Sequence, residues 1–297
     1  MEKERRPGRG TDMIEKKIPF FQLKQIADSG QCFRMTPCAD PDDSYTVISG
    51  THFVKVSQTG DTVRFFCSDE EYSFWEQYFD LNTDYGAYFA AVDENDPYLK
   101  KAAEFGQGIR ILRQDPWEMI ITFIISQQKT IPAIRQLVEA LSCRYGTRKD
   151  GFYTFPTPAQ LSAASLEDLL SMKLGYRAKY IRRVCEDACA GRLDLARLSV
   201  LPYEEAMEYL TGFYGIGEKV ANCICLFGLH HIDAFPVDTW IKKILDREYA
   251  PKSHIPAGLP KAHFYDALVK EHFARYCGFA GIMQQYIFYF ERSTLKK

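Results

Sequence analysis

The pattern of apolar residues changes at Asp115, and this change limits the fold more than any other feature of the sequence. Before Asp115, apolar and polar residues alternate in three short runs separated by turn-forming residues. Alternation with a period of two is typical of strands that bury one face. The pattern therefore predicts an antiparallel meander with strands at 45–49, 52–57 and 62–67, a further strand at 32–35, and covering helices near 69–78 and 96–105.

From Asp115 onward the pattern is helical. Asp115 suits a helix N-cap, Pro116 suits the first helical position, and Glu118 completes a capping box. The apolar run at 119–125 predicts a buried central helix. Similar signals predict later helices that begin at Pro158, Ser165, Arg177 and Pro202.

These patterns predict a mostly α protein with an N-terminal α+β lobe. We expect residues 1–12 to form a disordered tail and residues 13–115 to form a lobe with a small antiparallel sheet and helices. Residues 116–297 are expected to form an all-helical body.

The composition excludes several classes of protein. The 297 residues carry 37 Lys and Arg against 39 Asp and Glu, and no apolar run approaches the ~18 residues of a membrane helix. The N-terminus lacks the apolar segment of a secretory signal, and the nine cysteines include no C-x-x-C pair for a zinc ribbon. We expect an intracellular protein, cytoplasmic or nuclear, with no membrane association and no catalytic metal or other cofactor.

A glycine-rich turn between two helices is the densest local signal. The first helix is predicted at 202–210 and the second from Glu218, with Gly212, Gly215 and Gly217 between them. Glycines allow the backbone to approach a phosphate closely, and the free N–H groups of a helix N-terminus bind anions. We therefore favour a DNA phosphate-binding hairpin at about 202–228. In the alternative, the glycines only form the corner of an ordinary helix pair.

Lys219 lies in the first turn of the second predicted helix. The positive end of the helix dipole disfavours an ammonium there, and a neutral amine is a nucleophile that can form a Schiff base with a sugar C1′. Cys223 lies one turn further along the same face, where it could also be an ordinary small core residue. By itself, a lysine at position 219 would more often be a phosphate-contacting or solvated lysine than a nucleophile.

Asp238 precedes the helical run 239–248 and suits the N-cap of that helix. Capping is a complete structural explanation for this residue. A carboxylate at this position could also stabilise a cationic sugar in a transition state.

The hairpin, the lysine and the Pro-Val-Asp sequence together resemble the helix-hairpin-helix superfamily of base-excision DNA glycosylases. The chain lacks the C-terminal cysteine cluster of the iron–sulfur branch of that superfamily. Several segments are similar to the 8-oxoguanine DNA glycosylase family in particular, and they span most of residues 15 to 290. These segments are 29–34, 108–116, 174–180, 219–225 and 279–284.

This resemblance implies a catalytic pair and a base pocket. Lys219 would be the nucleophile that forms the Schiff base, and Asp238 would support it electrostatically. An extruded base would lie between Cys223 and Phe288. Gln284 would bind its Watson–Crick edge, and the backbone carbonyl of Gly30 would accept the N7–H that distinguishes 8-oxoguanine from guanine.

The resemblance also implies contacts to the DNA around the lesion. Tyr176 would fill the gap that the extruded base leaves, while Arg177 and Gln128 would read the opposite base. Eukaryotic members carry an Asn at position 128, an Arg at position 133 and a His at position 240, whereas this chain has Gln128, Ala133 and Trp240. Backbone carbonyls of the hairpin could also hold a structural cation, namely those of Thr211, Phe213 and Ile216.

The sequence therefore predicts a bifunctional DNA glycosylase and β-lyase that excises 8-oxoguanine with relaxed preference for the opposite base. Its expected partner is double-stranded DNA that contains an oxidised purine, and it is expected to act as a monomer. Two alternatives remain at this point. One is a monofunctional alkyl-purine DNA glycosylase, and the other is a non-catalytic helix-hairpin-helix DNA-binding protein.

Overall fold

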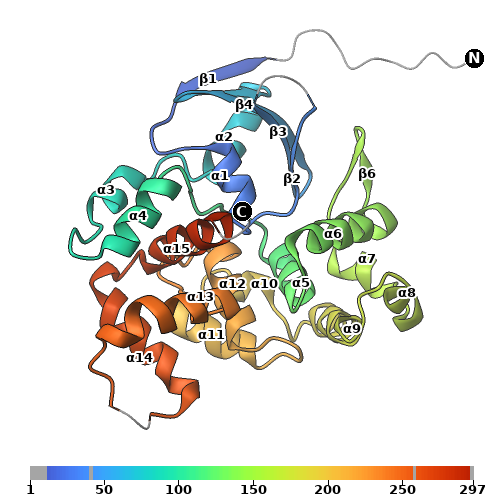
Figure 1. The fold of residues 1–297 in the computed structure, drawn as a ribbon. Coiled ribbons are helices and arrows are strands. Elements are labelled where there is room, and N and C mark those ends of the chain that lie inside the picture. Colours follow the sequence, from blue (N-terminus) through green and yellow to red (C-terminus); the bar gives the residue numbers. More distant parts are fainter. Residues whose placement is uncertain (1–11, 40–42, 257–258, 295–297) are drawn as a thin grey trace, which may run out of the picture.

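The computed structural model describes residues 12–39, 43–256 and 259–294. The disordered tail expected over 1–12 lies, apart from Asp12, outside the described residues. In the described part of the chain, five antiparallel strands form one sheet in the order β1-β5-β4-β3-β2 (Figure 1). The strands are β1 (Met13–Lys17), β2 (Met35–Pro37), β3 (Ser44–Ser49), β4 (His52–Thr59) and β5 (Thr62–Phe66).

The alternating runs of the sequence form the centre of this sheet, as predicted. Val47 of β3 pairs with Val54 of β4, and Val56 of β4 pairs with Phe65 of β5. These four side chains are fully buried and share a core with Trp75 of α2 (Asp69–Tyr78). The predicted helix at 69–78 therefore covers the sheet.

Two strand boundaries differ from the prediction. Strand β1 was not predicted, because its MIEKK sequence pairs only with β5 and leaves most of its side chains exposed. Strand β2 begins only at Met35, where the strand predicted at 32–35 ends. Residues 32–34 are all buried, so they lack the alternation of a strand with one exposed face.

The second helix expected over the sheet packs elsewhere. It forms as α4 (Pro97–Gly106), but it lies along α15 (Ala280–Thr294), with the rings of Phe105 and Tyr289 5.4 Å apart. The prediction of its packing partner was wrong. An amphipathic pattern shows that a helix has a buried face but does not show which element covers that face.

The predicted central helix is α5 (Pro116–Ser126), whose residues from Trp117 to Ile125 are all buried. Asp115 caps it by accepting a hydrogen bond of 2.7 Å from the backbone N–H of Glu118. The reciprocal bond of a capping box is absent between these two described residues. The Glu118 side chain is buried instead, and this burial raises its pKa to about 7.

The remaining predicted helix starts are confirmed to within one residue. Thr157 and Ser165 cap their helices through complete capping boxes. The remaining described helices are α1 (Leu23–Asp28), α3 (Tyr85–Ala90), α6 (Ile131–Tyr145), α7 (Pro158–Ser162), α8 (Leu166–Ser171), α9 (Arg177–Cys189), α10 (Leu195–Leu198), α11 (Tyr203–Thr211), α12 (Glu218–Phe227), α13 (Thr239–Ile244), η1 (Leu245–Tyr249), η2 (Ala250–Lys252), α14 (Lys261–Phe273) and η3 (Ala274–Tyr276).

A small β-hairpin interrupts the body that was expected to be all-helical. It consists of β6 (Arg148–Lys149) and β7 (Phe152–Tyr153), and Figure 1 shows it projecting toward the sheet. Phe152 stacks on Phe53 of β4 with ring centroids 5.6 Å apart. Lys149 donates a 2.9 Å hydrogen bond to the carbonyl of Thr51. The hairpin thus adds a contact between the sheet and the helices. No described helix is long and apolar enough to cross a membrane.

The buried side chains of the described residues form two hydrophobic cores. The first joins the sheet to α1 and α2, and the second joins α5, α12 and α15. Residues from α3 and α4 belong to the second core, although they precede Asp115 in the sequence. The two cores are therefore not divided at a single point of the chain.

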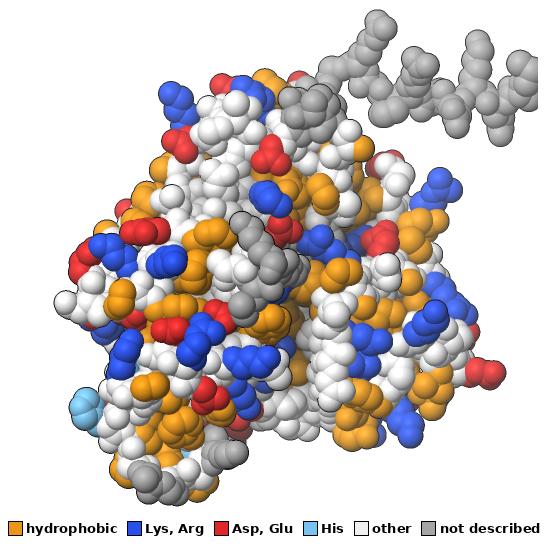
Figure 2. Space-filling view, in the orientation of Figure 1, with side chains coloured by type: hydrophobic (Ala, Val, Ile, Leu, Met, Phe, Trp, Pro, Cys, Tyr) orange, Lys and Arg blue, Asp and Glu red, His pale blue; other side chains and the backbone are white. Residues whose placement is uncertain are grey.

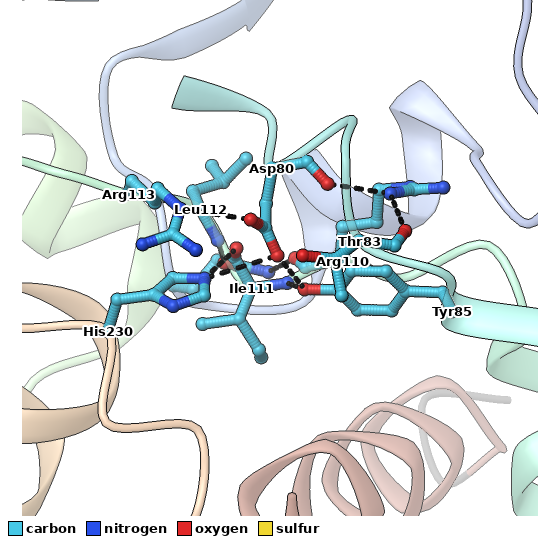
Figure 3. A network of polar contacts seen from close by, with 9 residues as sticks. Asp80, Thr83, Tyr85, Arg110, Ile111, Leu112, Arg113 and His230 are labelled. Atoms are coloured by element: carbon cyan, nitrogen blue, oxygen red, sulfur yellow. Dashed lines mark hydrogen bonds and ion pairs between the residues drawn. The ribbon is translucent and has the colours of Figure 1, made fainter. Parts of the chain in front are cut away.

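A buried carboxylate, Asp80, connects the two cores (Figure 3). It follows α2 and accepts hydrogen bonds from the hydroxyl of Tyr85 at 3.1 Å and from Nε of Arg113 at 2.9 Å. Nε2 of His230, which follows α12, lies 3.3 Å from the same carboxylate. Burial would raise the pKa of Asp80, but the bonds from His230 and Arg113 outweigh it and lower the pKa to about 2.

We expect Asp80→Asn to lower the free energy of unfolding by about 2 kcal/mol at pH 6, because the carboxylate is stabilised mainly in the folded state. The pKa of Asp80 falls from 3.8 to about 2 on folding. Its stabilisation is therefore complete above about pH 4 and is lost as the pH falls toward 2. Urea unfolding between pH 6 and pH 3 measures this difference.

Asp266→Asn is the matched control, because Asp266 is exposed on α14. It should leave stability unchanged at every pH. Equal stability of the wild type and Asp80→Asn at pH 6, or a difference that grows in acid, would contradict the assignment.

Candidate active site

Lys219 directs its amine toward the protein interior. It lies in the first turn of α12, and its side chain is half-buried. The amine nitrogen lies 5.7 Å from the centre of the Phe123 ring in α5, and its charge acts on the thiol of Cys223 one turn further along α12. The predicted proximity of Lys219 and Cys223 on one helical face is therefore found in the structure.

The Cys223 thiol forms an apolar surface beside this amine. Its side chain is buried, and burial raises the pKa of the thiol, while the neighbouring Lys219 acts in the opposite direction. The thiol is therefore protonated at neutral pH. A protonated, buried thiol behaves as a small apolar side chain and not as a nucleophile.

Asp238 is the N-cap of α13, as its sequence position suggested. Its Oδ1 accepts hydrogen bonds of 2.9 Å from the backbone N–H groups of Trp240 and Ile241. Its other oxygen receives no hydrogen bond from a described residue. The carboxylate also acts electrostatically on the Cys223 thiol, so it lies on the same side of the molecule as Lys219. Capping and electrostatic support of a reaction at Lys219 are compatible in this geometry.

Gln284 and Phe288 lie one turn apart on α15. The Gln284 side chain is buried, and its amide nitrogen donates a 3.1 Å hydrogen bond to the carbonyl of Pro236, two residues before Asp238. Phe288 is half-buried beneath the guanidinium of Arg292, which lies 5.1 Å from the ring centre. These contacts place Gln284 next to the Asp238 loop.

Gly30 lies close to Phe288 and has a left-handed backbone conformation that favours glycine. Its φ is +82°, and a Cβ atom there would come within 3.2 Å of the Phe288 ring and 3.1 Å of Ile131. Among the described residues, none donates a hydrogen bond to the Gly30 carbonyl. The contact with Phe288 brings the two residues together, whereas the position of a base between Phe288 and Cys223 stays a prediction.

Tyr176 and Arg177 stand at the start of α9. The Tyr176 ring is 43% exposed, whereas Arg177 is buried with its guanidinium 4.4 Å from the centre of that ring. Arg177 donates hydrogen bonds to the backbone carbonyls of Gln127 and Leu174. Gln128 is exposed beside it, with a left-handed φ of +53°. The three residues expected to contact the lesion site therefore cluster, but Arg177 is already engaged by the protein.

The three hairpin glycines have different structural roles. Gly215 has a φ of +91°, and a Cβ there would lie 2.3 Å from Cγ of Tyr180. Gly212 ends α11 with an ordinary φ of −70°. Gly217 caps α12 with a φ of −89°, and a Cβ there would meet no atom within 4 Å. The fold itself therefore demands glycine at 215 but not at 217.

The carbonyls proposed to hold a cation are only partly free. The Phe213 carbonyl already accepts a 3.1 Å hydrogen bond from the backbone N–H of Ile216. No group of three or more His, Cys, Asp or Glu side chains that could hold a metal ion occurs among the described residues. A cation bound by the carbonyls of Thr211, Phe213 and Ile216 stays a prediction.

Several residues of the site were not found from the sequence. Gln127 donates a 3.1 Å hydrogen bond to the carbonyl of Gly215 and so joins the α5–α6 turn to the hairpin. Phe123 lies beneath the amine of Lys219, and Tyr180 packs against Gly215. Each is an ordinary core or turn residue by pattern, so only the tertiary structure reveals its position at the site.

Basic side chains are spread over the surface formed by α6 and α9, although the net charge of the chain is −2 (Figure 2). Lys173 and Lys179 are exposed there. Two arginines of α9 pair with acids one turn away, Arg182 with Glu186 at 3.1 Å and Arg183 with Asp187 at 3.2 Å. Local positive charge beside the hairpin is compatible with a phosphate-bearing partner.

Family models match most of the chain. The model of the 8-oxoguanine DNA glycosylase N-terminal domain matches residues 13–120. The model of the HhH-GPD superfamily of base excision DNA repair proteins matches residues 121–262. The two matches adjoin just after the start of α5.

Individual relatives agree with these models. A probable N-glycosylase/DNA lyase from Methanothermobacter thermautotrophicus is 30% identical, over 72% of this chain and 72% of the relative. The N-glycosylase/DNA lyase of Saccharomyces cerevisiae is 37% identical over 50% of this chain, and the match spans 45% of the yeast protein.

Solved structures extend the similarity to the whole fold. The Clostridium acetobutylicum 8-oxoguanine glycosylase/lyase, in complex with double-stranded DNA containing cytosine opposite 8-oxoguanine, superposes with a TM-score of 0.84 at 34% identity. The match covers 96% of this chain and 98% of the Clostridium chain. The chain therefore belongs to the 8-oxoguanine DNA glycosylase family of the HhH-GPD superfamily of base excision DNA repair proteins.

Proposed function

We propose that this chain excises 8-oxoguanine from double-stranded DNA and then cleaves the abasic site by β-elimination, with Lys219 as the nucleophile. The position of the Lys219 amine over the buried Phe123 ring carries the proposal, because it directs the amine inward on the helical face that also bears Cys223. In its neutral form, the amine attacks C1′ of the damaged nucleotide, and the base leaves with the electrons of the N-glycosidic bond. The attacking nitrogen gives up a proton to the departing base, and the C1′–O4′ bond then breaks as O4′ takes up a proton. The opened sugar is joined through C1′ to the Lys219 nitrogen as a protonated imine.

The second step breaks the DNA strand. Loss of a proton from C2′ of the imine expels the 3′ phosphate oxygen, and water later hydrolyses the imine to release Lys219. The free Oδ2 of Asp238 supports the first step, because a carboxylate stabilises the positive charge that develops at C1′ as the base departs. This chemistry needs only the amine and the carboxylate.

The unpaired carbonyl of Gly30 supports recognition of the oxidised base. 8-Oxoguanine carries an N7–H donor, whereas guanine presents an N7 acceptor. An acceptor facing the Gly30 carbonyl leaves both groups without a partner, at a cost of about 1–3 kcal/mol. The base would lie between Cys223 and Phe288, with Gln284 at its Watson–Crick edge. Tyr176 would offset the cost of extruding the base, because its exposed ring would occupy the position that the base leaves in the stack.

We expect borohydride to trap the wild type covalently on duplexes that contain 8-oxoguanine, because reduction of the imine makes the bond permanent. Lys219→Gln should abolish both trapping and base excision. Asp238→Asn keeps a capping side chain and should slow excision by about a hundredfold through loss of charge. Gel electrophoresis of the protein–DNA adduct and of the excised product measures both steps.

Each alternative function gives a different result in this experiment. Base excision without a trapped adduct would indicate a monofunctional glycosylase that uses water. DNA binding without excision would indicate a non-catalytic module. Either result would contradict the role of Lys219.

We also propose a relaxed preference for the base opposite the lesion. Ala133 has no side-chain hydrogen-bonding group, and the Arg177 guanidinium is occupied by the Gln127 and Leu174 carbonyls. A bidentate contact to a base contributes about 1–3 kcal/mol of discrimination, so its loss makes the excision rates opposite the four bases more similar. The Clostridium relative was solved with cytosine opposite 8-oxoguanine, so cytosine is the reference base.

We expect single-turnover excision rates opposite cytosine, adenine, guanine and thymine to lie within about tenfold of each other. Ala133→Arg introduces the residue that eukaryotic members carry, and it should raise the preference for cytosine. A strong cytosine preference in the wild type would contradict the proposal.

Substitutions of the hairpin glycines distinguish an effect on folding from an effect on DNA binding. Gly217→Ala should leave the melting temperature unchanged but weaken duplex binding about tenfold, because its methyl group projects into space that the protein leaves open. Gly215→Ala should lower the free energy of unfolding by at least about 2 kcal/mol. The alanine would have to adopt a left-handed φ, and its Cβ would clash with Tyr180.

Gly151→Ala is the control for backbone strain alone, because Gly151 has a φ of +94° and no atom within 4 Å of a built Cβ. It should destabilise less than Gly215→Ala and leave DNA binding unchanged. Melting temperatures and binding titrations at one fixed salt concentration give both quantities. Normal DNA binding by Gly217→Ala would argue against a phosphate at this turn.

A further inference from the structure

The amide of Gln284 is held at both ends by the protein. Its nitrogen donates a 3.1 Å hydrogen bond to the carbonyl of Pro236. Its oxygen accepts a 2.8 Å hydrogen bond from the amide nitrogen of Gln285. Both glutamine side chains are almost completely buried, at 3% and 2% exposure. Water therefore competes little with either bond.

These two bonds fix which end of the Gln284 amide is oxygen. A glutamine amide can turn over and exchange its donor and its acceptor. The Pro236 carbonyl can only accept, so its bond favours the nitrogen of Gln284 on that side but is a single contact. Gln285 then places a donor against the oxygen. After both bonds are made, Gln284 retains one N–H and one oxygen lone pair for a ligand.

Gln285 makes this contact at a cost to the stability of the protein. Its own amide oxygen is buried and has no hydrogen-bond partner among the residues that the structure describes. A buried acceptor without a partner is unfavourable, and an apolar side chain of similar size would avoid this loss. Packing therefore does not explain a glutamine at position 285, whereas orientation of its neighbour does.

The orientation of Gln284 distinguishes two classes of purine. A guanine-type Watson–Crick edge presents an N1–H donor beside an O6 acceptor, whereas an adenine-type edge presents an N1 acceptor beside an N6–H donor. An amide with a fixed oxygen pairs with one of these edges and opposes the other. If the amide turned over freely, it could pair with both.

We propose that Gln285 is a positioning residue that sets the selectivity of the pocket for guanine-type over adenine-type oxidised purines, by holding the oxygen of the Gln284 amide in one orientation. This inference rests on the proposed function, in which Gln284 contacts the extruded base. To the residues of that function it adds Gln285, which does not touch the base itself.

The test compares excision of 8-oxoguanine and 8-oxoadenine from otherwise identical duplexes. Gln285→Leu removes the donor, and it should slow single-turnover excision of 8-oxoguanine about tenfold and narrow the ratio between the two lesions. Gln285→Glu sets an acceptor against the Gln284 oxygen, so its effect should be larger. Gln285→Met keeps the length of the side chain and replaces Gln285→Leu if that variant does not fold.

Borohydride trapping on a duplex with a preformed abasic site provides the internal control. This step needs Lys219 but no base, so all Gln285 variants should trap as the wild type does. Tyr286→Phe is the matched control variant, because it removes another buried, unpartnered oxygen from the next position of α15. It should change neither excision nor the ratio of the two lesions.

Three results would overturn the inference. Excision rates and lesion ratios could be unchanged in both Gln285→Leu and Gln285→Glu. Trapping at the abasic site could fall in parallel with excision, which would indicate a general structural role. A wild type that neither excises 8-oxoguanine nor traps on an abasic site would instead reject the proposed function, and the inference with it.

Discussion

The packing of α12 against α5 determines where the Lys219 amine lies, and the rest of the site is arranged around that amine. The rings of Phe123 and Phe227 stack across this contact with centroids 5.4 Å apart. The contact directs the first turn of α12 inward, so Lys219 lies over Phe123 and beside Cys223. A loop lysine would have more conformational freedom than one held by two packed helices. The position of this amine is therefore a product of the hydrophobic core.

The other residues proposed to line the base pocket come from the regions of both hydrophobic cores. Gly30 lies in the loop between α1 and β2, on the side of the first core, whereas Phe288 lies on α15 in the second. Their contact requires the sheet and the helices to keep one relative position. Asp80 contributes to this through its bonds to Arg113 and His230. A carboxylate far from the reacting atoms thus supports the geometry of the pocket.

Much of the fold could be predicted from local pattern, because strands β3 to β5 alternate clearly and the caps at Asp115, Thr157 and Ser165 are strong signals. Strand β1 could not, because an edge strand with a polar sequence leaves no periodic trace. The association of α4 with α15 is a long-range contact that no local pattern contains.

The same distinction holds for the site. The chemistry proposed for Lys219 and Asp238 follows from residue type and helix position, together with the family resemblance. The engagement of Arg177 by the Gln127 carbonyl does not, because it depends on two segments fifty residues apart. The requirement for glycine at 215 is likewise set by Tyr180, whose position is known only in three dimensions. Sequence patterns and the family resemblance therefore proposed the groups of the candidate site, and tertiary contacts show which of them the protein already engages.

The buried Cys223 thiol has a consequence for the conditions under which the protein works. 8-Oxoguanine forms where peroxides and radicals attack DNA, and the same oxidants convert accessible thiolates to sulfenic and sulfinic acids. Peroxide reacts with the thiolate, and burial keeps Cys223 in its protonated form and away from solvent. The Cys223 thiol is thus protected from the agents that create the lesion.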